Sequence, residues 1–249
     1  MSSGAVNLHE LQLGFDGVVA ANITLTIKPS EIVVFLGPSG CGKSTILRAL
    51  AGLLAPMGGS ATVDGAPVTG NAAQCAMVFQ EDALFPWRSA LKNVQFPLKL
   101  RGMRGKELTK AATARLEQVG LGAYLHHLPS QLSGGMRQRV QLARTLACEP
   151  QVMLMDEPFG ALDAQTRLQM QQLLTSVWEA QRMTLLFVTH DVDEALLLAD
   201  RIVLLSHRPA TVAEIITIEQ PRTPEAQFQE SYQRRRRAIL DFLGHRPAA

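Results

Sequence analysis

Residues 37–44 have the types and spacing of a loop that binds phosphate. They read GPSGCGKS and fit the pattern G-x-x-x-x-G-K-[ST]. Glycine lets backbone N–H groups turn toward phosphate oxygens without a Cβ in the way. Lys43 would then bring a positive charge to the β- and γ-phosphates, and Ser44 a hydroxyl to Mg²⁺. The alternative is an ordinary glycine turn. The pattern favours a nucleoside triphosphate site.

Two neighbouring carboxylates, Asp156 and Glu157, could complete such a site. They follow the apolar run Val152–Met155. An acidic residue at the carboxyl end of a parallel strand beside a phosphate loop can hold Mg²⁺, usually through water. The next carboxylate can orient or deprotonate an attacking water. We therefore expect Asp156 at the metal and Glu157 as the base of hydrolysis, with a solvated strand end as the alternative.

The elements around residues 37–44 suit a phosphate loop. Ile32–Leu36 is a short continuous apolar run, which is typical of a central parallel strand covered on both faces. A helix is expected from Lys43 to about Leu53. Its positive end would point at the phosphate oxygens that the loop holds.

Three further runs predict other strands of a parallel sheet. They are separated by stretches with helical spacing, which is the rhythm of βαβ units. One more strand is expected at Ala213–Ile218. In the first 30 residues, apolar and polar residues alternate instead, as at Ile23, Leu25 and Ile27, and this predicts half-buried strands. The three runs are Val152–Met155, Leu185–Val188 and Ile202–Leu205, and a strand is also expected at Ala76–Phe79.

The segment between residues 83 and 149 contains helical patterns and no comparable strand pattern. Lys106–Val119, for example, carries apolar residues on one helical face. We interpret residues 1–249 as a single α/β domain. Residues 1–82 and 150–249 would form a mostly parallel core with an N-terminal antiparallel β part, and residues 83–149 an inserted helical subdomain.

The composition excludes several classes of protein. Lys and Arg number 24 against 22 Asp and Glu, a net charge of +2, which argues against a nucleic-acid coat. No apolar stretch approaches the roughly 18 residues of a membrane span, and Met1–Glu10 lacks a secretory signal pattern. The 3 cysteines fit neither a disulfide framework nor a zinc site. We expect a soluble cytosolic protein in which Arg234–Arg237 forms a solvated face.

Residues 132–138, LSGGMRQ, point to a family. Together with the phosphate loop and the acidic pair, they resemble the signature of ATP-binding cassette (ABC) proteins over a stretch from about Leu8 to Arg222. The resemblance implies a P-loop NTPase (RecA-like) fold, ATP hydrolysis with Mg²⁺, and a dimer of two copies. Ser133, Gly134 and Gly135 would bind the γ-phosphate held by the other copy. Met136 stands where the family has Gln.

Other family positions find matches along the chain. Gln80 resembles the glutamine that touches Mg²⁺ and relays to a membrane partner, and Asp163 resembles part of the loop that crosses the dimer interface. His190 resembles the histidine that contacts the γ-phosphate, and Phe15 the aromatic residue that stacks on adenine. The resemblance thus implies a catalytic set of Glu157, His190, Lys43 and Gln80. The implied metal ligands are Ser44, Gln80 and Asp156. The implied nucleotide contacts are Phe15, Gly37, Pro38, Ser39, Gly40, Cys41, Gly42, Lys43, Ser44, Thr45, Gln80, Ser133, Gly134, Gly135 and Asp163.

Two classes of ABC protein remain as alternatives. Chromosome and repair members carry long coiled-coil insertions between phosphate loop and signature, and translation members usually carry two cassettes. The short spacing from Lys43 to Ser133 and the single phosphate loop favour the ATPase subunit of a transporter. The stretches 80–88 and 156–163, together with Met136, resemble the nitrate, sulfonate and taurine importers.

That resemblance implies the binding partners and the cellular location of the protein. Transmembrane permease subunits would bind the surface near Leu84–Arg88, and a solute-binding protein would act indirectly. Nucleic acid is not an expected partner. The protein would lie peripherally on the cytoplasmic face of the inner membrane. The sequence shows no solute pocket, and solute identity is not implied.

Overall fold

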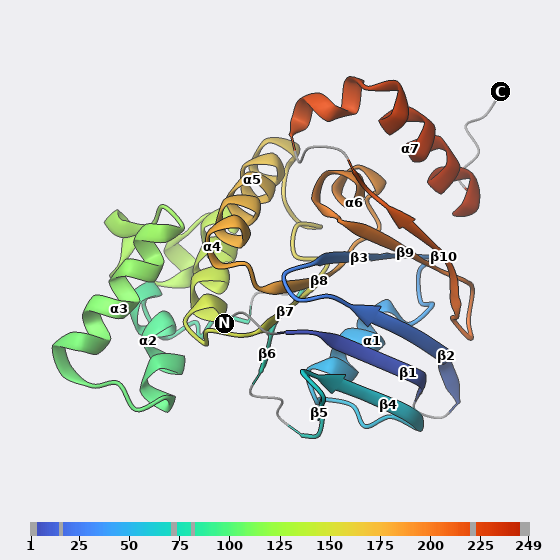
Figure 1. Ribbon diagram of the computed structural model, residues 1–249. Helices are drawn as coiled ribbons and strands as arrows, with labels where there is room; N and C mark the ends of the chain where they lie inside the picture. The colour runs from blue at the N-terminus through green and yellow to red at the C-terminus, as the bar shows by residue number, and fades with distance from the viewer. Residues whose placement is uncertain (1–3, 15–16, 71–73, 81–82, 220–222, 245–249) are drawn as a thin grey trace.

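The computed structural model describes residues 4–14, 17–70, 74–80, 83–219 and 223–244. Its centre is a six-stranded sheet with the order β10-β9-β3-β8-β7-β6 (Figure 1). The five strands from β9 to β6 are parallel, and β10 joins the edge antiparallel to β9. The strands are β3 (Ile32–Leu36), β6 (Cys75–Val78), β7 (Val152–Asp156), β8 (Thr184–Val188), β9 (Arg201–Leu205) and β10 (Val212–Thr217).

The continuous apolar runs are explained by two separate cores on the two faces of this sheet. In β3, Val34 and Leu36 belong to one core, and Val33 and Phe35 to the other. All five β3 side chains are buried. Strands β7 and β8 are likewise buried throughout. A strand that is covered on both faces has apolar side chains on both, so its sequence shows no alternation of apolar and polar residues. The burial of these strands confirms the expectation of central parallel strands.

A second, four-stranded antiparallel sheet lies beside the first. Its order is β2-β1-β4-β5. Helix α1 (Lys43–Leu50) lies between the two sheets and packs on strands of both (Figure 1). In β2, Ile23, Leu25 and Ile27 are buried while Thr24 is exposed, so the predicted alternation is confirmed. The strands are β1 (Val6–Gly14), β2 (Val18–Ile27), β4 (Gly58–Val63) and β5 (Ala66–Pro67).

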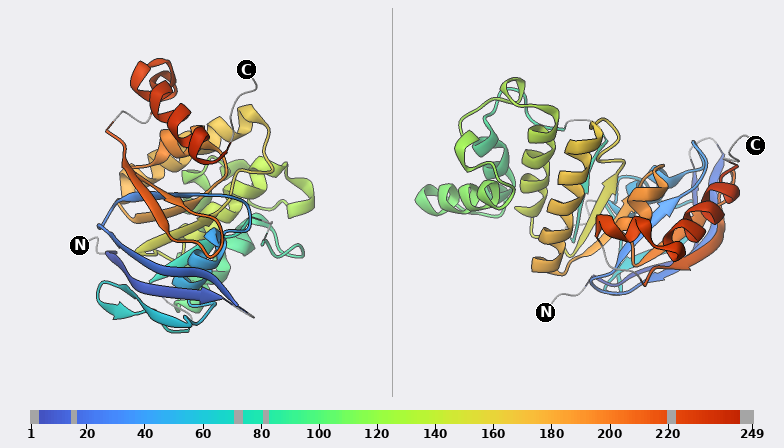
Figure 2. Two further views of the ribbon diagram at one scale, coloured as in Figure 1. Left: turned by 90° about the vertical axis from the view of Figure 1, so that its right-hand side faces the viewer. Right: turned by 90° about the horizontal axis from the view of Figure 1, so that it is seen from above.

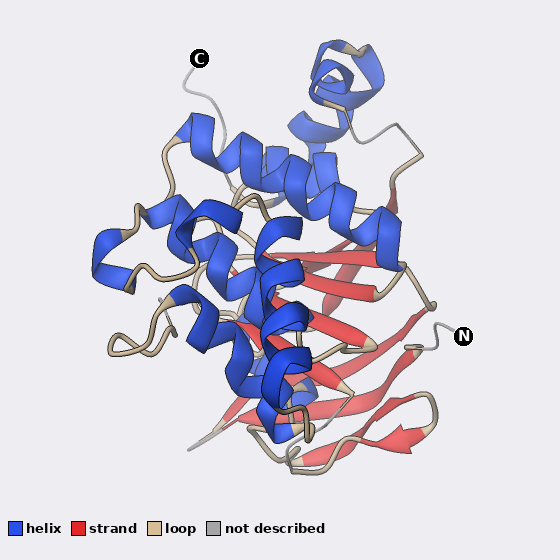
Figure 3. Cartoon of the chain, turned by 90° about the vertical axis from the view of Figure 1, so that its left-hand side faces the viewer, coloured by secondary structure: helices blue, strands red, loops and turns tan. Residues whose placement is uncertain are grey.

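The other face of the central sheet is covered by helices, which gather on one side of the strands in Figure 3. Among the described residues of 83–149, the regular elements are helices. Helix α4 (Gly134–Leu146) packs on β6, and the helices between residues 90 and 118 extend away from the sheets (Figure 2). None of the helices in the described ranges is both long enough and apolar enough to span a bilayer. The remaining helices are α2 (Ala90–Leu100), α3 (Gly105–Gln118), α4 (Gly134–Leu146), α5 (Ala164–Gln181), α6 (Val192–Leu198) and α7 (Glu230–Phe242), and short 3-10 turns occur at Gly122–Tyr124, Pro129–Gln131 and Pro224–Phe228.

Several element ends differ from expectation by a few residues. Helix α1 ends at Leu50 rather than Leu53, because Gly52 adopts a φ of 72° that stops the helix. The hairpin of β4 and β5 was not predicted. It turns at Asp64 and Gly65, which have φ of 50° and 77°, and a DG pair of this kind is the sequence signal for such a turn.

The chain just before α2, at residues 85–89, is held by one side chain. Asn93 is fully buried. Its Oδ1 accepts the N–H of Phe85 at 2.8 Å, and its Nδ2 donates to the carbonyls of Arg88 at 3.0 Å and Ser89 at 3.1 Å. Leu84, expected at a surface, is instead buried in the core because the loop folds back onto α2. Trp87, in contrast, exposes most of its large apolar side chain.

We predict that Asn93→Ala lowers the free energy of unfolding by about 2–4 kcal/mol, because it leaves buried backbone groups without partners. Urea denaturation followed by circular dichroism measures this. Gln95→Ala, on the same helix and with a single long bond to Thr109, should cost less than about 1 kcal/mol. Equal losses in the two variants would contradict the role given to Asn93.

Candidate functional site

The loop between β3 and α1 encloses one side of an open cavity of about 430 Å³. Gly40 and Gly42 have φ of 73° and 114°, a region that other residues rarely adopt, and a Cβ on Gly40 would project into open space. Cys41 is buried, so its thiol is a core group rather than part of the cavity wall. The lining residues are Val19, Ser39, Gly40, Gly42, Lys43, Ser44, Thr45, Gln80, Glu157 and Arg208.

Lys43 begins α1 and is almost completely buried. Its Nζ donates to the carbonyl oxygens of Gly37 at 2.8 Å and Pro38 at 3.0 Å. These bonds hold the ammonium inside the curve of the loop. The arrangement places a fixed positive charge and the positive end of α1 against the same cavity, and together they favour an anion there.

A hydrogen bond joins the phosphate loop to the end of β7. The Ser44 hydroxyl donates to Asp156 Oδ1 at 2.7 Å. Burial raises the pKa of Asp156, and the bond from Ser44 acts in the opposite direction. The structure therefore brings together the hydroxyl and the carboxylate that the sequence assigned to Mg²⁺. No cluster of three or more His, Cys, Asp or Glu that could hold a metal occurs in the described part of the chain.

Glu157 is where three separate segments meet. Its Oε2 lies 3.1 Å from Nδ1 of His190 and 3.5 Å from Nε2 of Gln80. Its backbone has a φ of 42°, left-handed for a residue with a side chain, and its N–H donates to the carbonyl of Val188 at 2.9 Å. The carboxylate is thus held at the cavity wall by β7 and β8 and is oriented by the two side chains.

The signature residues lie elsewhere. Among the described residues, Ser133, Gly134, Gly135 and Asp163 do not line the cavity. Ser133 caps α4 by accepting the N–H of Met136 at 3.3 Å, and Asp163 caps α5. Hydrogen bonds from Thr166 lower the pKa of the Asp163 carboxyl. One chain therefore presents two separate groups of polar residues. The expected adenine contact, Phe15, lies outside the described residues.

Comparison with known proteins agrees with this geometry. The family model described as ABC transporter matches residues 20–160. The nitrate import ATP-binding protein NrtD of Synechocystis sp. is 45% identical over 92% of this chain and 87% of its own. The taurine import ATP-binding protein TauB of Yersinia pestis is 47% identical over 86% of this chain and 84% of its own. The chain belongs to the ABC transporter family.

A solved structure supports the assignment to the ABC transporter family at the level of fold. The dimeric ATP-binding cassette MJ0796, in a post-hydrolysis state bound to ADP and Pi, matches with a TM-score of 0.77 and 32% identity. The match covers 86% of this chain and 99% of that chain. The expected P-loop NTPase fold is confirmed, and the chain is an ABC transporter ATPase.

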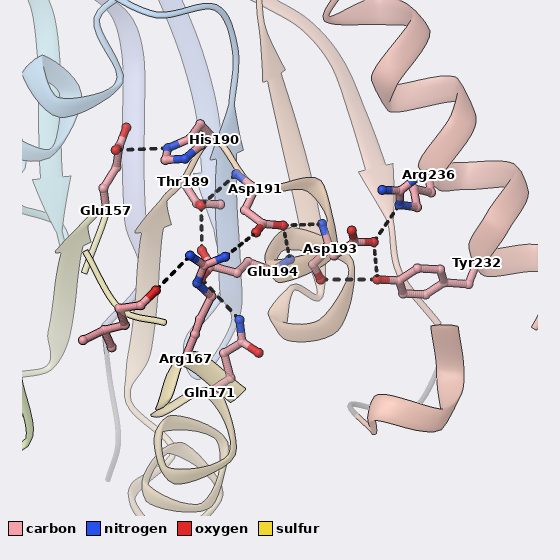
Figure 4. Close-up of polar contacts among 11 residues, drawn as sticks. Glu157, Arg167, Gln171, Thr189, His190, Asp191, Asp193, Glu194, Tyr232 and Arg236 are labelled. Atoms are coloured by element: carbon pink, nitrogen blue, oxygen red, sulfur yellow. Dashed lines mark hydrogen bonds and ion pairs between the residues drawn. The ribbon is translucent and has the colours of Figure 1, made fainter. Parts of the chain in front are cut away.

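A polar network that no sequence motif indicated supports the His190 segment of this ABC ATPase (Figure 4). Glu194 is buried, and it accepts a hydrogen bond from the Thr189 hydroxyl at 2.6 Å. Gln171 donates to its other oxygen at 3.3 Å. Arg167 pairs with Asp191 at 3.1 Å and donates to the carbonyl of Leu162. The network therefore links the segment before α5 to the residues on either side of His190.

The same network continues to α7. Asp193 accepts hydrogen bonds from the Tyr232 hydroxyl at 3.0 Å and from Arg236 Nε at 2.8 Å (Figure 4). Burial raises the pKa of Tyr232, and the neighbouring carboxylate of Asp193 raises it further. Within Arg234–Arg237, the partly exposed Arg236 also has a structural partner, because its guanidinium binds a carboxylate on α6.

The buried carboxyl of Glu194 gives a test of this network. Burial raises the pKa of Glu194, and the hydrogen bond from Thr189 opposes that effect. The folded state thus holds this proton more tightly than the unfolded chain. The contribution of Glu194 to stability then falls as pH rises from the ordinary value toward the raised one.

We predict that Glu194→Gln gains stability relative to the wild type as pH rises from about 5 to about 8, because the amide has no charge to bury. Urea denaturation at the two pH values measures the difference. Glu194→Ala leaves Thr189 and Arg167 without this partner and should lose about 2–4 kcal/mol at both. A stability difference between Glu194→Gln and the wild type that does not change with pH would contradict the prediction.

Proposed function

We propose that the chain is the ATPase subunit of a membrane importer for nitrate, taurine, another sulfonate or a related small solute. The relatives described above, which are nitrate and taurine import proteins, support this class. They do not favour a soluble ABC ATPase of DNA repair or translation. The observation that carries the proposal is the convergence of Lys43, Ser44 and Glu157 on one cavity.

The cavity suits ATP with Mg²⁺. Lys43 and the start of α1 supply the positive potential that phosphates need, and the glycine-rich loop leaves room for them. Ser44, Asp156 and Gln80 would hold Mg²⁺ together with phosphate oxygens, because a hydroxyl, a carboxylate and an amide are ligands of its hard-oxygen type. When bound, Mg²⁺ neutralises charge on the phosphate oxygens.

The chain's own residues then have separable parts in hydrolysis. Glu157 presents a carboxylate that can orient the attacking water and accept its proton. His190 and Gln80 hold this carboxylate by its Oε2 atom. Lys43 binds phosphate and does not take part in the proton transfer. The Arg167 and Glu194 network fixes the backbone on both sides of His190.

A second copy of the chain would complete each site. Ser133, Gly134, Gly135 and Asp163 lie at the first turns of α4 and α5, away from the cavity of their own chain. A helix start with free N–H groups is suited to bind a phosphate. In the proposed dimer, these residues close over the ATP held by the partner. The dimeric state of the similar cassette MJ0796 supports this arrangement.

A groove on the helical part is the proposed contact for a permease subunit. Its volume is about 650 Å³, and it is lined by Trp87, Arg88, Phe96 and Leu100 among other residues. Trp87 and Leu100 are 73% and 74% exposed, which is high for apolar side chains of this size. We propose that residues 83–149 move as a unit and pass closure of the dimer to the permease.

Binding to a permease would place the chain peripherally on the cytoplasmic face of the membrane. A separate solute-binding protein and the permease would then select the solute.

We predict that Lys43→Ala reduces ATP affinity and ATPase rate by at least about a hundredfold, because the charge at the phosphates is lost. Fluorescent-nucleotide binding and phosphate release measure the two effects, with circular dichroism as a check of folding. Lys110→Ala, an exposed lysine on α3, is the matched control. A folded Lys43→Ala protein with wild-type turnover would exclude the proposed site.

We predict that Glu157→Gln reduces ATPase turnover by about 10²–10⁴-fold and forms a dimer with ATP, because ATP that is not hydrolysed keeps favouring the closed pair. Light scattering with ATP or with ADP, both in EDTA, measures the mass. With ADP the protein should remain a monomer, since ADP lacks the γ-phosphate.

In the double variant Glu157→Gln, Ser133→Arg, the ATP-dependent dimer should be abolished, because the arginine places a bulky side chain at the shared phosphate. The same mass with ATP and ADP, in the isolated chain and in the assembled transporter, would rule out the contact across the dimer.

A further inference from the structure

One cationic side chain of the cavity belongs to none of the motifs above. Arg208 comes from the connection between β9 and β10, yet it lines the same cavity as Lys43 and Ser44. It is exposed, and no hydrogen bond or ion pair engages its guanidinium within the described ranges. Lys43, in contrast, already donates to two carbonyl oxygens. Arg208 therefore brings to the cavity a positive charge that is available to bind a ligand.

The connection that carries Arg208 is held firmly at the site. Ala210 is fully buried; its N–H donates to the carbonyl of Val19 at 2.8 Å, and its own carbonyl accepts the N–H of Ala21 at 2.9 Å. Ser206 and Thr211 close the connection, since the Ser206 N–H donates to the Thr211 carbonyl and the Thr211 N–H donates to Ser206 Oγ. These bonds fix the backbone on both sides of Arg208.

The same connection touches the phosphate loop directly. A Cβ on Gly37 would lie 3.0 Å from the carbonyl oxygen of Leu205, the last residue of β9. A Cβ on Gly42 would lie 2.8 Å from Cγ1 of Val19, which carries the Ala210 bond. Both glycines are thus needed to let the loop approach β9 and β2. Arg208 stands where these three segments meet.

Strand order decides which end of a nucleotide Arg208 would face. Glu157 and Gln80 reach the cavity from β7 and β6, on one side of β3. Arg208 and Val19 reach it from the opposite side, where β9 and β10 lie (Figure 1). A nucleotide with its terminal phosphate at Glu157 would direct its nucleoside toward Arg208.

We propose that Arg208 is a nucleotide-binding residue whose guanidinium contacts the α-phosphate. A guanidinium forms charge-assisted, often paired, hydrogen bonds with phosphate oxygens. ATP and ADP share this group, so Arg208 contributes equally to the affinity for both. It takes no part in hydrolysis, because Glu157 lies at the other end of the cavity. This inference rests on the proposed nucleotide site.

Nucleotide titrations of the full-length chain test the proposal. We expect Arg208→Ala to weaken fluorescent ATP and fluorescent ADP by the same factor, about five- to thirtyfold. Arg208→Lys, which retains the charge, should lose less than Arg208→Ala, and Arg208→Glu should lose more. In ATPase assays, KM should rise while kcat stays within about twofold of the wild type. His207→Ala, an exposed neighbour in the same connection, is the matched control and should bind as the wild type does.

Three results would overturn the role of Arg208. They are unchanged affinity in Arg208→Ala, a loss confined to ATP, and a loss in Arg208→Lys as large as that in Arg208→Ala. The last result would point to stacking on the base rather than to a charge on phosphate. Failure of the wild type to bind either nucleotide would instead count against the nucleotide site itself, so the two proposals fail by different outcomes.

Discussion

The hydrogen bond from Ser44 to Asp156 is the interaction on which the geometry of the site depends. It joins the first turn of α1, the helix that follows β3, to the end of β7, a strand separated from β3 by β8. The bond therefore ties the start of α1 to the end of β7, and the helix packs on β7 and β8. The antiparallel sheet holds it there from the other side, packing β1 and β2 against α1. A core formed largely by the first 63 residues thus determines where the phosphate loop sits.

Much of this arrangement could be predicted from the sequence, and the reason is physical. A strand covered on both faces, such as Ile32–Leu36, has to be continuously apolar, and that pattern is visible without a structure. The turn at residues 37–44 could be predicted because its backbone requires glycine at positions such as Gly40 and Gly42. Element ends were less certain, since a single residue such as Gly52 decides them locally. The order of the strands is set by long-range pairing, which no local pattern of residues records.

Side chains that act through distant partners could not be predicted. Arg208 and Glu194 carry no motif, and their surroundings come from segments far apart in the chain. Gly135 is a different case. A Cβ there would lie 2.4 Å from the Thr166 methyl group on α5. Packing against α5 within the same chain therefore requires glycine at this position. The family resemblance implies a second role, phosphate binding, and the sequence alone does not distinguish the two.

The backbone of Glu157 has a consequence for how the chain can vary. Its left-handed φ of 42° costs a residue with a side chain about 1–2 kcal/mol, and glycine would avoid that cost. Selection for thermal stability alone would therefore favour glycine at this position, while selection for turnover would retain the carboxylate. The two pressures oppose each other at a single residue. The rest of the fold must be stable enough to tolerate an unfavourable conformation at the residue that we propose as the base of hydrolysis.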